Sequence, residues 1–507
     1  MNEKDKVKLG IRKWTKREPF ERLIAVIDIG SNSVRMVVFK GLRRNPKIIF
    51  NERVLCGLGK QVSSHGKMGE DAMIMALSTL KRFALLCNDM KVDVVDAFAT
   101  AAVRDATNGK AFTALIKSNC GINVRTISGV DEAKYSAYGV ISGFQNATGI
   151  VGDLGGGSLE LINIENDKII DRVTLPIGPM RLLAENSAIS QEQIAYISEQ
   201  LNSVPWLKAG EGKSFFMVGG AWRSLTRLYL NTDNYPLKVL QGYTVAANKM
   251  IEFSANIATK SPSDIERLAK ISKRRMPLLP TAALVLHKVL EHSGCTEVIS
   301  SDNGIREGIL YKMLNHNLRK QDPFVSACKD IADRTGRFPE HAAKLMKWMD
   351  PVFENENAED NRLRYACCML SDIGWEGHPD YRAENVFEYI FHGRFTGIDH
   401  RGRALVALAL YVNYGGPLSA KPVKHARAVL NEQDQVQAQL IGEAIRLGQR
   451  LTGGTSNPLK YTSLKLSKNK VSLVLPANYF DLAGKVVIGR LKDLAKVLKR
   501  DSEVIRE

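Results

Sequence analysis

Two short segments of this sequence carry the same arrangement of residues that can do chemistry. Each is an apolar run that ends in an aspartate, followed by a turn of small residues and a second apolar run. The matching residues, at one constant spacing, are Asp28, Gly30 and Ser33 in the first segment and Asp153, Gly155 and Ser158 in the second. A carboxylate, a hydroxyl and the backbone N–H groups of a tight turn can together hold phosphate and a hard metal ion. The repetition therefore predicts two related domains that face each other across a cleft.

The carboxylates are candidate metal ligands. Asp28 and Asp153 each end an apolar strand ahead of a glycine turn, so their side chains should point into the space above a sheet edge. Mg²⁺ combines a few carboxylates with phosphate oxygens, and two such aspartates could hold it directly or through its waters. Glu160 follows Ser158 by two residues and could join them, or equally pair with a nearby arginine. The alternative for a strand-ending aspartate is a turn in which the carboxylate bonds its own loop.

Three small-residue turns are candidate phosphate sites, because a backbone without side chains lets an anion approach its N–H groups. They are Ser31-Asn32-Ser33, Gly155-Gly156-Gly157-Ser158 and, at a strand–helix junction, Gly219-Gly220. The alternatives are a plain hairpin turn for the triple glycine and an ordinary tight connection for Gly219-Gly220. Trp222, which follows, is expected to pack in the core.

Glu132 and Arg104 are the candidate catalytic side chains. Glu132 stands at the start of an expected helix, where the helix dipole favours its ionised form, and a carboxylate there can accept a proton from water. The same dipole makes acidic residues common in first helical turns without any catalytic role. Arg104 follows a buried strand and can clamp phosphate, or pair with Asp105 at the surface.

Hydrophobic periodicity supplies the elements that position these residues. Expected strands cover residues 23–29, 34–39, 47–55, 92–99, 124–127, 149–151, 169–175, 215–218, 297–300, 461–466 and 470–475. Expected helices cover 72–86, 111–118, 131–144, 191–207, most of 243–290, 307–314 and 492–500. Residues 1–22 are polar and basic and are expected to form a flexible arm. The alternation of strands and helices predicts an α/β fold with mixed sheets, and the region after about residue 322 is expected to be mostly helical.

Composition narrows the class of protein. The 507 residues suggest roughly three domains, and the net charge of +17 favours a polyanionic partner over the alternative that it only aids solubility. The seven cysteines form no C-x-x-C pair and are expected to be buried thiols of a reducing compartment. The histidines, His341 and His392 among them, form no metal motif and are expected to be structural or exposed. No apolar run approaches the length of a membrane span, so no membrane partner and a cytoplasmic location are expected.

Five motifs in this order resemble the exopolyphosphatase / guanosine pentaphosphate phosphatase family, which belongs to the superfamily of actin, sugar kinases and heat-shock-chaperone ATPases. They are Asp28-Ile-Gly-Ser-Asn-Ser33, Ala99-Thr-Ala-Ala-Val-Arg104, Ser128-Gly-Val-Asp-Glu132-Ala133, Asp153-Leu-Gly-Gly-Gly-Ser-Leu-Glu160 and Arg306-Glu-Gly308. The resemblance covers about residues 23–320. It implies that Glu132 is the general base, that Arg104 binds phosphate, and that Asp28 and Asp153 orient Mg²⁺ and phosphate.

The resemblance also implies an organisation of the chain. After the arm of residues 1–22, two duplicated ribonuclease-H-like (actin-like ATPase) domains are expected, at 23–147 and 148–320, followed by a mostly helical HD-like domain at 321–507. Where HD-type metal phosphohydrolases read His-Asp, this sequence has Ser371-Asp372. The metal site of that last domain is therefore expected to be degenerate.

The implied activity is Mg²⁺-dependent hydrolysis of the terminal phosphoanhydride of inorganic polyphosphate, and the resemblance suggests a homodimer. The nearest alternative is 5′-phosphohydrolysis of guanosine pentaphosphate. Two other classes remain open: a kinase of the same superfamily, and a protein that binds polyphosphate or nucleic acid without turning it over. A kinase would make ADP from ATP, and a binder would release no phosphate.

Overall fold

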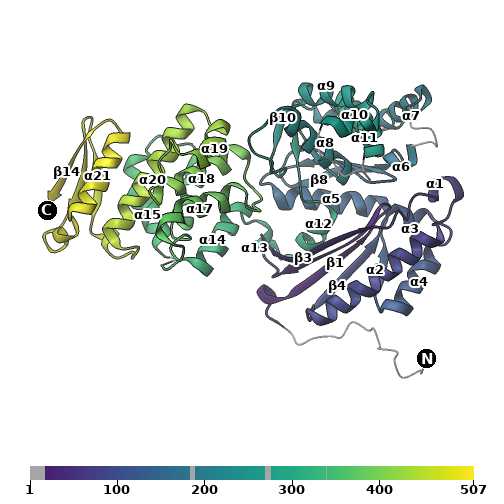
Figure 1. The fold of residues 1–507 in the computed structure, drawn as a ribbon, viewed down its shortest axis with the longest axis horizontal. Helices are drawn as coiled ribbons and strands as arrows, with labels where there is room; N and C mark the ends of the chain where they lie inside the picture. Colours follow the sequence, from purple (N-terminus) through teal and green to yellow (C-terminus); the bar gives the residue numbers. More distant parts are fainter. Residues whose placement is uncertain (1–16, 183–188, 269–275, 339) are drawn as a thin grey trace. The chain divides into compact units, whose positions relative to one another are not determined.

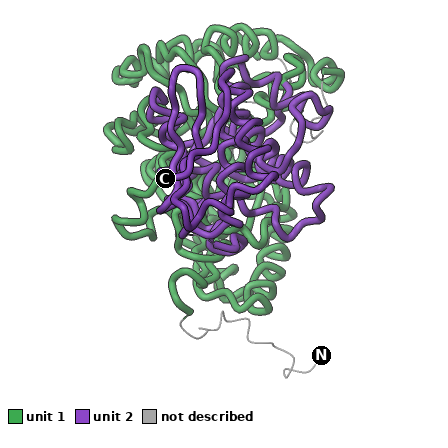
Figure 2. The backbone as a smooth tube through the Cα atoms, turned by 90° about the vertical axis from the view of Figure 1, so that its left-hand side faces the viewer, with its two compact units in different colours: residues 1–235, 240–323 green, residues 236–239, 324–507 purple. Residues whose placement is uncertain are grey.

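The computed structural model describes residues 17–182, 189–268, 276–338 and 340–507, and most of the expected N-terminal arm lies outside them. The chain divides into two compact units, shown in Figure 2. Unit 1 holds residues 1–235 and 240–323, and unit 2 holds residues 236–239 and 324–507. Within unit 1, we call residues 23–147 the first half and residues 148–320 the second half.

The first half is built on a five-stranded mixed sheet in the order β3-β2-β1-β4-β5 (Figure 1). Its strands are β1 (Leu23–Ile29), β2 (Ser33–Lys40), β3 (Lys47–Leu55), β4 (Val94–Ala99) and β5 (Val124–Thr126). The pairs β1–β2 and β2–β3 are antiparallel, whereas β1–β4 and β4–β5 are parallel. Strand β1 is apolar on both sides, apart from Asp28, because helices cover both faces of the sheet. One face packs on α2 (Glu70–Asp89) and α4 (Gly109–Cys120).

The second half repeats this arrangement. Its sheet has the order β10-β11-β9-β6-β7-β8, from β6 (Gly149–Leu154), β7 (Leu159–Glu165), β8 (Lys168–Leu175), β9 (Ser214–Val218), β10 (Thr244–Ala246) and β11 (Glu297–Ser300). Read from β8 to β11, the strand order and the parallel and antiparallel pairings equal those from β3 to β5. The described part of residues 243–290 is mostly helical, as expected, but Thr244–Ala246 form β10, an edge strand beside β11.

The two hairpins that carry the aspartates agree residue by residue. Asp28 lies opposite Arg35 in the β1–β2 register, and Asp153 lies opposite Glu160 in the β6–β7 register. The turns close with the same backbone hydrogen bond: Gly30 N–H donates to the Ser33 carbonyl at 3.0 Å, and Gly155 N–H donates to the Ser158 carbonyl at 3.0 Å. Equivalent positions therefore carry a cation in the first half and an acid in the second.

Two helices lie between the sheets, and glycines let their backbones approach closely where they cross (Figure 1). They are α5 (Gly129–Gly143) and α12 (Ile305–Met313). A Cβ on Gly308 would lie 1.8 Å from the Tyr135 carbonyl oxygen, and one on Gly139 would lie 2.3 Å from the Gly304 carbonyl oxygen. Glycine at these positions lets the two backbones meet.

The remaining helices of unit 1 surround the two sheets. They are α1 (Val62–His65), α3 (Ala101–Asp105), α6 (Pro179–Leu182), α7 (Gln191–Asn202), α8 (Gly220–Thr232), α9 (Ala247–Ala258), α10 (Pro262–Leu268), α11 (Leu279–Ser293) and α13 (His316–Arg319). The helix expected over 191–207 ends at Asn202. Pro205 opens a separate 3₁₀ turn, Pro205–Gly210, because proline cannot donate the hydrogen bond that continues a helix.

Unit 2 is mostly helical around the buried helix α18 (His400–Asn413). Its other helices are α14 (Pro323–Thr335), α15 (His341–Met349), α16 (Ala358–Leu370), α17 (Arg382–Phe391), α19 (Lys424–Val429), α20 (Glu432–Thr452) and α21 (Lys485–Val497). The expected late strand pair is present as β12 (Ser463–Leu466) and β13 (Lys470–Leu475). A third strand, β14 (Asp501–Arg506), was not expected and pairs parallel with β13.

All seven cysteines are buried and free, as expected for thiols that only pack. No helix among the described residues is long and apolar enough to cross a membrane.

Candidate active site

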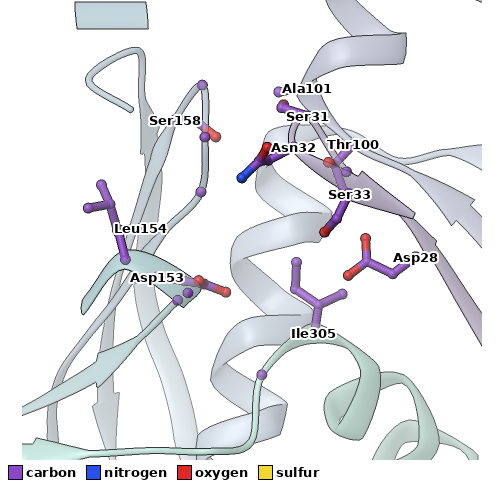
Figure 3. Close-up of a pocket in the computed structure, with 18 of the residues that line it drawn as sticks. Asp28, Ser31, Asn32, Ser33, Thr100, Ala101, Asp153, Leu154, Ser158 and Ile305 are labelled. Carbon is purple, nitrogen blue, oxygen red and sulfur yellow. The ribbon is translucent and has the colours of Figure 1, made fainter. Parts of the chain in front are cut away.

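A cavity of about 180 Å³ lies between the two halves of unit 1 and collects most of the residues singled out in the sequence. Figure 3 shows Asp28 and Asp153 pointing into it from opposite sides. The lining includes the candidate phosphate-binding residues Ser31, Asn32, Ser33, Gly155, Gly156, Gly157, Ser158, Gly219 and Gly220, and the acids Glu132 and Glu160. The two hairpins thus line the same cavity, as the repeated sequence motif predicted.

Close contacts account for two glycines of the lining, Gly219 against backbone and Gly156 against a side chain. Gly219 has a positive φ of 105°, and a Cβ there would lie 2.5 Å from the Leu154 carbonyl oxygen. A Cβ on Gly156 would lie 2.9 Å from the sulfur of Met180. Trp222 packs in the core as expected, fully buried, with its indole N–H donating to the Ala282 carbonyl at 2.9 Å.

Burial raises the pKa values of three acids in the cleft, Asp28, Asp153 and Glu160, and so favours their neutral forms. Asp28 accepts a hydrogen bond of 2.7 Å from Arg306, and Asp153 accepts one from the Ser136 hydroxyl. Burial raises the pKa of both carboxyls, although these partners oppose the shift. Glu160 is 1% exposed, and its Oε1 has no hydrogen-bond partner. Burial, reinforced by Glu132 and Asp153, raises the pKa of Glu160 well above its ordinary value.

Glu132 lies in the first turn of α5, which Ser128 caps by accepting a 3.1 Å hydrogen bond from the Asp131 N–H. Glu132 is 5% exposed, and its carboxylate accepts a 3.1 Å hydrogen bond from Arg104. Burial raises the pKa of Glu132 to about 7, with Arg104 lowering it and the charges of Asp153 and Asp28 raising it. A carboxyl with that pKa exchanges protons readily near neutrality.

Arg104 does not itself line the cavity. It lies in α3, directly after β4, and reaches the site through Glu132. Its Nε also donates to Asp105 at 3.2 Å, so the surface pair considered in the sequence is present as well.

Four arginines line the same cavity: Arg35, Arg53, Arg223 and Arg306. Arg35 and Arg53 are direct cross-strand partners, and like charges in that position repel. Burial, together with the positive charges of Arg306 and Arg223, lowers the pKa of Arg35 to about 10. Four cations gathered in one cleft favour a ligand with several negative charges.

The donors in the cleft fit a hard divalent cation that is completed by substrate oxygens. Among the described residues, no group of three or more His, Cys, Asp or Glu is close enough to hold a metal by protein ligands alone. Glu160 nevertheless keeps a buried oxygen without a partner and lies opposite Asp153 in the β6–β7 register, and Asp28 points into the same cavity from the other side (Figure 3). Mg²⁺ is usually held in this way, by one or two carboxylates together with phosphate oxygens.

Sequence reasoning assigned no role to three residues of the lining, Thr100, Arg53 and Arg223, and it missed Ser136, which lies outside the lining and hydrogen-bonds Asp153. Arg306 stood in a quoted motif but had no assigned role. Arg223 could have been found from the sequence. It lies four residues after Gly219, in the first turn of the helix that begins at this glycine turn, and a side chain there lies close to the site.

Unit 2 holds Ser371 and Asp372 at the place where a metal site was expected to be degenerate. Arg337 donates to both oxygens of Asp372, its NH2 at 2.6 Å and its Nε at 3.1 Å. Burial lowers the pKa of His341 to about 4, and its Nε2 lies 3.2 Å from the Thr452 hydroxyl. Asp372 is therefore occupied by an arginine of its own unit.

The fold and cleft together define a phosphate-handling α/β protein with two alike sheets. The chain belongs to the Ppx/GppA phosphatase family, whose sequence model matches residues 36–317, and residues 324–505 match the family model described as exopolyphosphatase, C-terminal.

Individual relatives agree with this assignment. The chain is 27% identical to retrograde regulation protein 2 of Saccharomyces cerevisiae over 82% of this chain and 77% of that protein. It is 27% identical to exopolyphosphatase 1 of Mycobacterium leprae over 58% of this chain and 89% of that one. It is 24% identical to guanosine-5′-triphosphate,3′-diphosphate pyrophosphatase of Photobacterium profundum over 91% and 93%.

A solved structure shares the fold over part of this chain. The crystal structure of an exopolyphosphatase from Cytophaga hutchinsonii superimposes with a TM-score of 0.52 at 24% identity, over 58% of this chain and 97% of that one.

Proposed function

We propose that the cleft of unit 1 hydrolyses the terminal phosphoanhydride of inorganic polyphosphate and releases phosphate. The observation that carries this is Glu132, a buried carboxyl whose pKa of about 7 suits a base, in a cavity lined by four arginines and three small-residue turns. The polyphosphate substrate is the one named for the Mycobacterium relative and for the family model that matches unit 2.

In the proposed reaction, water attacks the end phosphorus in line and Glu132 accepts its proton. Arg104 holds Glu132 in place, and it acts on the phosphoryl group through that carboxylate. Backbone N–H groups of the turns 155–158 and 219–220, with Ser31, Asn32 and Ser33, bind the phosphoryl oxygens. The arginines of the cleft hold the rest of the polyanion.

Mg²⁺ or another hard divalent cation would be held by Asp28, Asp153 and Glu160. When bound, it would neutralise charge on the phosphate oxygens. The unpartnered oxygen of Glu160 supports this assignment.

Hydrolysis of the 5′ end of guanosine pentaphosphate is a second candidate. It is supported by the similarity to the Photobacterium pyrophosphatase, which extends over 91% of this chain. Both reactions break a terminal phosphoanhydride, so the same cleft residues would serve either substrate.

We also propose the finer organisation expected from the sequence. The equal strand orders of the two halves support duplicated ribonuclease-H-like domains at 23–147 and 148–320. The helices of unit 2 and the arginine-occupied Asp372 support an HD-like domain at 321–507 without a working metal site. A homodimer in the cytoplasm remains a proposal, and for the location the buried free thiols are the support.

One assay tests the proposed function: purified protein with Mg²⁺, long-chain polyphosphate and no nucleotide, with free phosphate as the readout. Wild type should release phosphate steadily. Glu132→Gln should lower the rate by about 100-fold or more, the usual contribution of a general base, while polyphosphate binding is retained. Glu52→Gln, which alters a surface acid paired with Arg82, is the matched control and should keep the full rate.

The other classes give different results in the same assay. Tight binding without phosphate release by wild type would indicate a non-catalytic binder. Formation of ADP only when ATP and an acceptor are supplied would indicate a kinase. Full activity of Glu132→Gln would refute the assignment of the base.

A further inference from the structure

Asp105 accepts hydrogen bonds from two arginines that belong to different halves of unit 1. Arg104, its neighbour in α3, donates through Nε at 3.2 Å. Arg181, in α6 of the second half, donates through NH2 to the other oxygen at 2.8 Å. Asp105 therefore links α3 and α6 across the cleft.

Each arginine continues the link to a part of the proposed site. Arg104 donates through NH1 to Glu132 at 3.1 Å. Arg181 donates through Nε to the carbonyl of Gly157 at 3.1 Å, within the turn proposed to bind phosphate. An unbroken series of polar contacts thus joins the phosphate turn of the second half to the carboxylate on α5 of the first.

The local packing makes this series responsive to the turn. Met180, beside Arg181, donates its N–H to the Gly156 carbonyl at 2.8 Å. A Cβ on Gly178 would lie 2.3 Å from the Gly157 carbonyl carbon, so α6 starts directly against the turn. A change in the turn would therefore move Arg181.

The exposure of Asp105 argues against a mainly stabilising role. Its side chain is 33% exposed and that of Arg181 is 37% exposed, and ion pairs this accessible add little to stability. What Asp105 can supply is direction: it fixes the Nε edge of the Arg104 guanidinium, so that NH1 faces Glu132.

We propose that Asp105 is a positioning residue, which uses Arg181 of the opposite half to orient Arg104 on Glu132. The proposal rests on the proposed function of the cleft. In this proposal the Arg181–Asp105–Arg104 series orients the Glu132 carboxylate. It does so only when the phosphate turn of the second half lies against the first half, because Arg181 and Asp105 are then in contact.

The test measures phosphate release from polyphosphate by Asp105→Asn, Arg181→Gln and the double variant. Each single change should lower kcat by about tenfold, because small losses of alignment at a reacting group have effects of that size, while KM changes by less than about twofold. The double variant should be no slower than the slower single one, since both changes break one series. Asp105→Glu should recover part of the lost kcat.

A variant in which the two charges are exchanged tests whether Asp105 orients Arg104 or only holds the two halves together. The variant with Asp105→Arg and Arg181→Asp restores a pair between the halves but places a cation beside Arg104. Its kcat should stay low, and recovery of wild-type kcat would overturn the proposal. Glu52→Gln is the matched control, because the side chain of Glu52 is 31% exposed and also pairs with an arginine.

The remaining outcomes are distinguishable. Wild-type protein that releases no phosphate would refute the proposed function, and the role of Asp105 with it. An active wild type with unchanged kcat in Asp105→Asn, or single effects that multiply in the double variant, would refute the role of Asp105 alone.

Discussion

The pKa of Glu132 depends more on the burial of its side chain than on its position at the start of a helix. The start of a helix favours an ionised acid, but the surroundings of the cleft raise its pKa to about 7. Arg104 on one side and the carboxyls of Asp153 and Asp28 on the other act on this value in opposite directions.

The first prediction at this scale concerns pH. If ionised Glu132 is the base, kcat/KM should fall about tenfold for each pH unit below its pKa of about 7, because the protonated carboxyl cannot accept a proton. The measurement is phosphate release at low substrate between about pH 5 and pH 8.5. A rate that stays flat down to about pH 5 would contradict it.

The second prediction concerns Glu160. Its raised pKa means that the folded state binds this proton more tightly than the unfolded state, so stability is present below the ordinary value of 4.5 and lost as pH rises through the folded pKa. Glu160→Gln replaces the titrating carboxyl with an amide that is always neutral, and it should raise the thermal unfolding midpoint at pH 7.5. The same change should weaken the response of activity to Mg²⁺.

The pH dependence of that gain is its check. The difference in unfolding midpoint between wild type and Glu160→Gln should shrink as the pH approaches 4.5. A variant that is less stable than wild type at pH 7.5 would contradict the prediction.

At the residue scale, the sequence located the site but not all of its charge. Asp28 and Asp153 could be paired because both turns share one spelling. Arg53 and Arg223 belong to no repeated motif, and their arrival in the cleft depends on strand register and helix packing. The raised pKa of Glu132 could not be predicted either, because it comes from groups that meet only in the folded chain.

At the element scale, the crossing of α5 and α12 sets the position of Glu132 and Arg306. A glycine of each helix lies at the crossing, so the backbone of the helix that carries Glu132 meets the backbone beside Arg306 directly. Arg44 adds to this by donating to the carbonyls of Ser142 and Ile141, at 2.6 and 3.1 Å, near the end of α5.

The prediction at this scale is that Gly308→Ala destabilises the protein. The added methyl group would lie 1.8 Å from the Tyr135 carbonyl oxygen, a backbone atom that cannot rotate away, and overpacking of this kind costs about 1–3 kcal/mol or more. Chemical denaturation followed by circular dichroism measures it. Gly489→Ala is the control, because nothing lies within 4 Å of a Cβ there, and it should be neutral or stabilising.

Elements were predicted well where the pattern was strong and local. The hairpins β1–β2 and β6–β7 follow from apolar runs that a turn interrupts. Strands β10 and β14 were missed because each is set by a neighbour: β10 pairs with β11, and β14 pairs parallel with β13 after the crossover through α21. The sequence of β14, Asp501–Arg506, has only two apolar residues and carries little signal of its own.

At the scale of the whole molecule, the net charge of +17 has a measurable consequence. We predict that KM for polyphosphate rises steeply with salt while kcat changes little, because binding a polyanion to cations releases counterions that salt opposes. Arg53→Gln should reduce the slope of log KM against log salt by roughly one. Arg82→Gln, on the surface beside Glu52, should leave the slope unchanged, and a salt-independent KM would contradict the prediction.

The sequence indicated the broad organisation correctly at this scale: a mixed α/β region with two sheets, followed by a mostly helical region. The family matches over residues 36–317 and 324–505 meet where the two compact units divide. The boundary expected at residue 320 lies three residues from the division between the units, which follows Pro323.

Equivalent strand positions of the two hairpins carry Arg35 in the first half and Glu160 in the second, so the hairpins are not equivalent in charge. A linear phosphate polymer bound between the two hairpins would meet an arginine at one position and a carboxyl at the equivalent position of the other, so the two hairpins would not bind its terminal group in the same way. Shortening would then proceed from an end, and cyclic polyphosphates, which have no end to offer, would be poor substrates.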